Sequence, residues 1–202
     1  MGVTRTTTTR SNCEQSRTVT SHKYGVEITR TVLQAHRLDE NNGDSVWRKA
    51  IDKEMTNVGI AFQLLDHGED PPVGYTRASG HLIFDVKMDF TRKARFVLDR
   101  HKTEKPEIST YAGVVTRERV LGSHYLHVYA ADIQNAYLKA PSSQKHYIEC
   151  GPEFGKENIG RKALIQRALY GGKIAGRDFR NHLRECMKHI NLSHASQILM
   201  YG

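Results

Sequence analysis

Basic residues alternate with apolar ones in the segment Lys93–Leu98, and another cation, Lys87, precedes this segment. Residues two apart share a face of a strand, so Lys93 and Arg95 are predicted to lie on one face and the apolar residues on the other. A cationic face backed by an apolar one can hold phosphate groups, and arginine adds paired hydrogen bonds. An ordinary solvated strand face has the same alternation, so this segment alone leaves both interpretations open.

An aspartate ends the aromatic and β-branched run Tyr125–Asp132, just before a compact turn over residues 135–138. Carboxylates at strand ends often serve metal-dependent phosphoryl transfer, because the strand fixes the oxygen while the loop leaves room for substrate. An aspartate that caps the turn after a strand would look the same. The position of Asp132 therefore predicts either a metal ligand or a turn cap.

Other patterns do not identify a site. Gly155–Lys162 resembles a phosphate-binding loop, but Arg161 and Lys162 stand where that motif has Lys followed by Ser or Thr. The histidines lack the paired spacing of a closed zinc site. The three cysteines are far apart and form no Cys-x-x-Cys pair, which favours a reducing compartment over a disulfide framework.

Helix and strand patterns are mixed without a regular βαβ rhythm, which predicts the α+β class. A helix capped by Asp44 or Ser45 is expected over residues 46–58, because apolar residues recur there at helical spacing. Strands are expected at His81–Met88 and Lys93–Arg100, forming a hairpin, and at Tyr125–Asp132 and His146–Cys150. A second helix is expected near the C-terminus, burying a stripe from Phe179 to Ile190.

The chain has 202 residues, of which 38% are hydrophobic, and a formal net charge of +8. Such a positive surplus favours polyanionic partners, above all nucleic acid. Residues 1–23 are rich in Thr, Ser and Arg with little to bury and are predicted to be disordered, whereas residues 24–202 are predicted to form the folded domain. No stretch is long and apolar enough to span a membrane or to start secretion.

Several segments, taken in order, resemble the reverse transcriptase of copia-type long-terminal-repeat retrotransposons. They are Val46–Met55, Pro72–Tyr75 with Phe84–Lys87, Lys93–Val97, Asp132–Leu138 and Leu169–Lys173. The resemblance implies a partial right-hand polymerase of fingers and palm, with a mixed or antiparallel sheet and packed helices. It also implies that the disordered N-terminal segment is a polyprotein junction.

The activity implied by the resemblance is RNA-directed DNA polymerisation with two magnesium ions. Asp132 stands at the position of the family's catalytic metal-binding aspartate, and the Ile133 carbonyl would add a ligand. Gly172 and Lys173 would lie near the base pair and the template.

The resemblance also implies how the incoming deoxynucleoside triphosphate is held. Lys87, Lys93 and Arg95 would hold its phosphates from the fingers. Tyr137 would lie beneath the sugar and exclude a ribose 2′-hydroxyl by its bulk. The expected partners are an RNA or DNA template–primer, deoxynucleoside triphosphates and other products of the retrotransposon polyprotein, within a cytoplasmic virus-like particle or the nucleus.

Three departures from the family pattern change the expectation. The sequence contains no Tyr-x-Asp-Asp motif, the interval from Val120 to Asp132 is too short for the family's apolar helix, and Gly172 replaces an apolar residue. We therefore expect a truncated copy that is inactive by itself. The alternative is a non-enzymatic, basic nucleic-acid-binding remnant.

Overall fold

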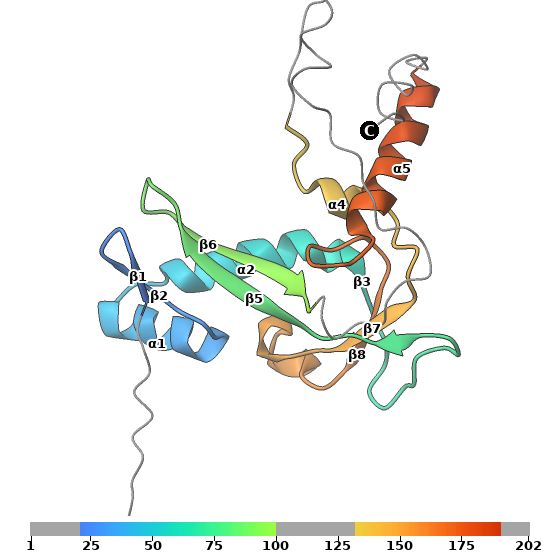
Figure 1. The fold of residues 1–202 in the computed structure, drawn as a ribbon. Coiled ribbons are helices and arrows are strands. Elements are labelled where there is room, and N and C mark those ends of the chain that lie inside the picture. Colours follow the sequence, from blue (N-terminus) through green and yellow to red (C-terminus); the bar gives the residue numbers. More distant parts are fainter. Residues whose placement is uncertain (1–20, 100–131, 191–202) are drawn as a thin grey trace, which may run out of the picture.

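Helices and strands are mixed in the computed structural model, which describes residues 21–99 and 132–190 (Figure 1). This arrangement confirms the predicted α+β class. The helices in these ranges are α1 (Val32–Asn42), α2 (Val46–Val58), α4 (Ala136–Lys139) and α5 (Ala175–His189). The strands are β1 (Ser21–Lys23), β2 (Val26–Ile28), β3 (Phe62–Leu64), β4 (Thr76–Arg77), β5 (Gly80–Val86), β6 (Arg92–Leu98), β7 (His146–Glu149) and β8 (Lys162–Ile165). The expected strand at 125–132 lies outside the described residues except for its last residue.

The hairpin of β5 and β6 has one buried face and one partly exposed face. The strands pair antiparallel, with Leu82 opposite Phe96 and Asp85 opposite Lys93. Every second side chain is buried, which confirms the alternation predicted for this segment. The buried members are Leu82, Phe84, Val86, Ala94, Phe96 and Leu98.

The start of α2 is held by a residue of the preceding helix. The buried carboxylate of Asp39 accepts hydrogen bonds from the backbone N–H groups of Trp47 at 2.9 Å and Arg48 at 2.8 Å. Ser45 occupies the N-cap position, as predicted, but its side chain makes no capping bond. Asp39 thus satisfies the exposed N–H groups of α2 from a distance in sequence, which also fixes α1 against α2.

Helix α2 covers the buried face of the hairpin. The ring of Trp47 meets that of Phe84 edge to face at 5.7 Å between centroids. The Glu54 carboxylate accepts a hydrogen bond of 2.9 Å from the backbone N–H of Phe96. Apolar packing and this bond together hold β6 on the helix.

A second, four-stranded sheet has the order β3-β8-β7-β4. Its strands pair antiparallel, except that β4 runs parallel to β7. The rings of Phe62 and Phe96 are 5.5 Å apart, and those of Phe96 and Phe154 are 5.9 Å apart. This aromatic cluster joins the hairpin to the second sheet in one core.

Some expected boundaries differ from the structure. Ser21–Lys23 form strand β1, although they are the last residues of the segment predicted to be disordered. The predicted C-terminal helix exists, but Cys186 and Ile190 are exposed, so its apolar stripe is not buried along its whole length. Within residues 21–99 and 132–190, no helix combines the length and the hydrophobicity needed to cross a membrane.

Candidate functional site

A cleft of about 230 Å³, which we call the basic cleft, lies along the edge of β6 that pairs with no strand of the described ranges. Segments far apart in the sequence meet there: α2, the β5–β6 hairpin, the turn before α4 and the turn before α5. The cleft is lined by Lys53, Glu54, Asn57, Lys87, Thr91, Arg92, Lys93, Ala94, Arg95, Asn135 and Tyr170. Cations outnumber carboxylates strongly in this lining, which suits an anionic ligand.

The carboxylates near the cleft already have partners. Glu54 accepts the N–H of Phe96. Asp85, opposite Lys93 in register, pairs instead with Lys23 at 2.6 Å. The hydrogen bond from Lys23 lowers the pKa of Asp85, helped by the backbone N–H of the next residue. The acidic groups thus stabilise the fold, and Arg92 donates to the Phe90 carbonyl at 2.8 Å. Lys87, Lys93 and Arg95 remain available for phosphate oxygens.

Arg95 lies over one ring of an aromatic cluster whose members meet edge to face. Its guanidinium carbon lies 4.5 Å from the centre of the Tyr170 ring. The ring of Tyr137 meets Tyr170 at 4.8 Å and Phe179 at 6.1 Å. Stacking restricts the guanidinium to one orientation while leaving its N–H groups free to donate.

The turn that carries Tyr170 is fixed to the end of β6. The Tyr170 carbonyl accepts a hydrogen bond of 2.8 Å from the Leu98 N–H. Gly171 follows with φ of 82°, and a Cβ atom there would overlap the Leu98 carbonyl oxygen. Only glycine fits this close approach of two backbone segments.

Asp132 and Ile133 are both exposed and precede α4, but neither lines the basic cleft. Asn135, three residues after Asp132, does line it, with φ of 52°. No group of three or more His, Cys, Asp or Glu side chains suited to a metal is present in the described ranges. One carboxylate and one carbonyl do not complete a site for two magnesium ions, so the described donors fit that cofactor only in part.

The structure brings some of the predicted site residues together. Lys87, Lys93 and Arg95 line one cleft, and Tyr137 is one ring away from Arg95 through Tyr170. Gly172 and Lys173 follow that turn and are half-buried outside the lining.

Sequence reasoning assigned Lys87, Lys93 and Arg95 to the site and missed the other eight lining residues. Among these are Lys53, Arg92, Asn135 and Tyr170. Lys53 stands beside the apolar stripe of its helix, and Arg92 lies one residue before the basic pattern, so both had a local signal. No local signal indicated the role of Tyr170, because its contact with Arg95 joins residues 75 positions apart.

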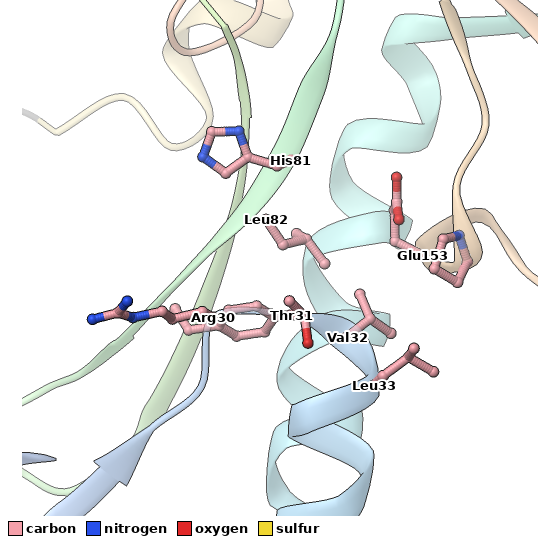
Figure 2. A pocket seen from close by; sticks show the side chains of 9 residues that line it. Arg30, Thr31, Val32, Leu33, His81, Leu82 and Glu153 are labelled. Atoms are coloured by element: carbon pink, nitrogen blue, oxygen red, sulfur yellow. The ribbon is translucent and has the colours of Figure 1, made fainter. Parts of the chain in front are cut away.

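A second cleft, of about 220 Å³, lies between the start of α1, strand β5 and the turn at 152–154 (Figure 2). Its floor is apolar, and Leu82 points into it between His81 and Glu153. The His81 ring is tied through Nδ1 to the buried carboxylate of Asp99 at 2.7 Å, and the Ser79 hydroxyl donates to the same carboxylate. These bonds fasten the ends of the hairpin, and the cleft lacks the concentration of cations seen in the basic cleft.

Comparisons of the chain with models of protein families, with curated proteins and with solved structures gave no match.

Proposed function

We propose that this chain is the fingers-and-palm part of a copia-type reverse transcriptase and that its basic cleft binds the phosphates of nucleotide and template–primer. The observation that carries the proposal is the meeting of three segments of the resemblance at this cleft. They are Lys93–Val97, Asp132–Leu138 and Leu169–Lys173, which contribute Lys93, Arg95, Asn135 and Tyr170 to its lining. The sequence patterns of the three segments, taken one by one, do not require the segments to lie close together in the fold.

The chemistry assigned to the cleft is the binding of phosphate. Arg95, oriented by the Tyr170 ring, donates paired hydrogen bonds to one phosphate group, while Lys87 and Lys93 act as point charges. Tyr137 stands behind Tyr170, and we assign it the sugar-selecting position. We assign Gly172 and Lys173 to the template side of the same turn.

The proposal gives this chain binding rather than catalysis. Asp132 is the catalytic carboxylate of the resemblance, yet among the described residues it belongs to no group of three or more possible metal ligands. We therefore propose phosphate binding without a chemical step for this chain and place it with retrotransposon products, in a virus-like particle or the nucleus. A non-enzymatic nucleic-acid-binding remnant remains the second candidate, supported by the same cleft.

The test is a titration of template–primer duplex at several salt concentrations. We expect weak binding that does not depend on base sequence and falls steeply with salt, because released counterions supply most of its free energy. Replacing Lys93→Gln and Arg95→Gln together should reduce the slope of log K against log salt by about two, if each contacts one phosphate.

The matched control is the pair Arg37→Gln and Lys49→Gln, which removes the same charge from exposed positions of α1 and α2 outside the cleft. This control should leave the slope nearly unchanged. Equal slopes for the two double variants, or binding indifferent to salt, would show that the cleft is not the phosphate site.

A further inference from the structure

Two hairpin turns lie side by side at one end of the molecule (Figure 1). One joins β1 to β2 at Tyr24, and the other joins β5 to β6 at residues 88–91. The ion pair of Lys23 with Asp85, at 2.6 Å, connects the two hairpins. Tyr24 and Met88, one from each turn, line one open groove of about 490 Å³. Phe90 belongs to the second turn and is exposed, but it does not line the groove. We call this region the tip site and define it by Tyr24, Met88 and Phe90.

Both turns carry an aromatic residue in the left-handed backbone region. The φ angle is 54° at Tyr24 and 61° at Phe90. Turns of these kinds normally place Gly, Asn or Asp at such positions, because a larger side chain crowds the backbone. The third non-glycine residue with positive φ in the described ranges is Asn135, a type that tolerates it. Backbone strain of this kind is typical of positions kept for function.

The side chains of the tip site are exposed to solvent. Tyr24 is 50% exposed, Phe90 is 55% exposed and Met88 is 81% exposed. They therefore add little to the core, although a glycine would relax the backbone. Exposed aromatic rings within reach of a separate cationic surface are a usual platform for stacking unpaired bases, since every base offers an apolar face.

The charges of the tip site favour bases over phosphates. Its groove contains two lysines and two aspartates. Lys23 is paired with Asp85, and Asp89 accepts the backbone N–H of Thr91 at 3.0 Å. Lys87 lines both this groove and the basic cleft. A nucleic-acid strand can thus keep its phosphates in the basic cleft while its bases reach the nearly neutral tip.

We propose that Tyr24 and Phe90, with Met88, form a stacking site for the unpaired bases of single-stranded nucleic acid, continuous with the basic cleft through Lys87. This inference deepens the proposed function and rests on it for the phosphate contacts. The occupant is an unpaired strand, because a paired duplex shields the base faces that stacking requires.

The variants Tyr24→Asn and Phe90→Asn separate folding from binding. Asn tolerates positive φ, so each change should leave the thermal unfolding temperature unchanged or raise it. Loss of binding in such variants cannot then come from loss of the fold. Ile159→Asn is the control, since it removes an exposed apolar side chain that does not line either groove.

The binding measurement uses fluorescence anisotropy with two labelled probes of equal length, oligothymidylate and an abasic oligonucleotide. The wild-type chain should bind oligothymidylate about tenfold more tightly than the abasic probe, as expected for one or two stacked bases. In the double variant this ratio should fall to about one, while affinity for the abasic probe stays the same. The Ile159→Asn control should keep the wild-type ratio.

Three results would overturn the proposal. The wild type could bind both probes equally, the double variant could keep the tenfold ratio, or the substitutions could change only self-association of the chain, which would make the tips a protein contact. Failure of the proposed function looks different: the Lys93 and Arg95 double variant would then keep the salt slope, while a base preference that depends on Tyr24 and Phe90 would persist. If neither probe bound at low salt, both proposals would be wrong.

Discussion

Arg95 owes its orientation to one neighbouring ring, that of Tyr170. The contact of 4.5 Å supplies an attraction of roughly 0.5–1 kcal/mol at a partly exposed site. It also removes rotational freedom that a free arginine would lose on binding phosphate. Tyr170 is thus a positioning residue for the cleft.

Replacing Tyr170→Leu should weaken binding of a deoxynucleoside triphosphate or template–primer about two- to fivefold, because the guanidinium is no longer stacked. Tyr170→Phe keeps the ring and should bind like the wild type. Isothermal titration of both variants and of Arg95→Gln measures the effect. If Tyr170→Leu weakened binding equally in the presence and absence of the Arg95 side chain, the two residues would act independently.

Cys150 shows how burial sets the chemistry of a single thiol. Its side chain is buried at the end of β7, and desolvation raises its pKa to about 11, with a smaller contribution from Glu153. The folded state therefore holds the thiol proton more firmly than the unfolded chain does. This contribution to stability is complete below pH 9 and is lost as the pH rises toward 11.

The free energy of unfolding should therefore fall between pH 9 and pH 11, by about 2 kcal/mol from this thiol. Cys150→Val should remove that part of the slope, whereas Cys186→Ser, at an exposed position, should retain it. Urea denaturation of the three proteins across this pH range makes the comparison. Parallel pH profiles for Cys150→Val and the wild type would contradict the effect of burial.

Sequence patterns predicted the helices and strands that depend on residues close together in the sequence. The alternation over β6 and the helical spacing over α2 predicted the right elements, since a strand and a helix each produce a characteristic spacing of apolar residues. The hairpin of β1 and β2 was missed because Tyr24 stands where its turn would normally have Asn. The cap of α2 by Asp39 was missed because the two are joined only in space.

The candidate site, too, could be predicted only where it depends on residues close together in the sequence. The basic face of Lys93 and Arg95 could be predicted from the strand period. The convergence of that face with Asn135 and Tyr170 could not, since no single-sequence pattern reports which distant turns meet. The resemblance implied that these segments share a function, but it did not predict their positions relative to one another.

The turn before α5 packs closely against the end of β6, and Gly171 makes this close contact possible. Replacing Gly171→Ala should destabilise the chain by about 2 kcal/mol or more, because its φ is unfavourable and its Cβ would strike the Leu98 carbonyl. Gly172→Ala is the matched control. Its φ lies outside the left-handed region, and its nearest contacts, at 3.1 Å and 3.4 Å, allow a small adjustment.

Thermal unfolding of both glycine variants measures the difference. A loss at Gly172→Ala as large as that at Gly171→Ala would show that the close approach to β6 is not the cause. Tyr170 is carried by the same turn, so Gly171→Ala should also disturb the contact with Arg95 and weaken ligand binding.

At the scale of the whole molecule, the basic cleft is not accompanied by a cluster of metal ligands among the described residues. Two magnesium ions about 4 Å apart repel each other, so a site for both needs several carboxylate oxygens. Among residues 21–99 and 132–190, Asp132 belongs to no group of three or more such ligands, and the sequence has no Tyr-x-Asp-Asp motif.

We therefore expect a polypeptide of these 202 residues to bind template–primer without extending it, with either magnesium or manganese. Primer extension on an RNA and a DNA template, with binding measured in the same samples, provides the check. The Asp132→Asn variant should bind as the wild type does. Deoxynucleotide incorporation that disappears in Asp132→Asn would mean that other carboxylates complete the site.

The contacts along the open edge of β6 have a consequence for the chain in crowded solution. An edge strand with unpaired N–H groups invites strand addition by another polypeptide and, from there, aggregation. Here the N–H of Phe96 is taken by the Glu54 carboxylate and that of Leu98 by the Tyr170 carbonyl. These bonds occupy donors that a foreign strand would need, so the cleft can stay open to a ligand without becoming a seed for intermolecular sheets.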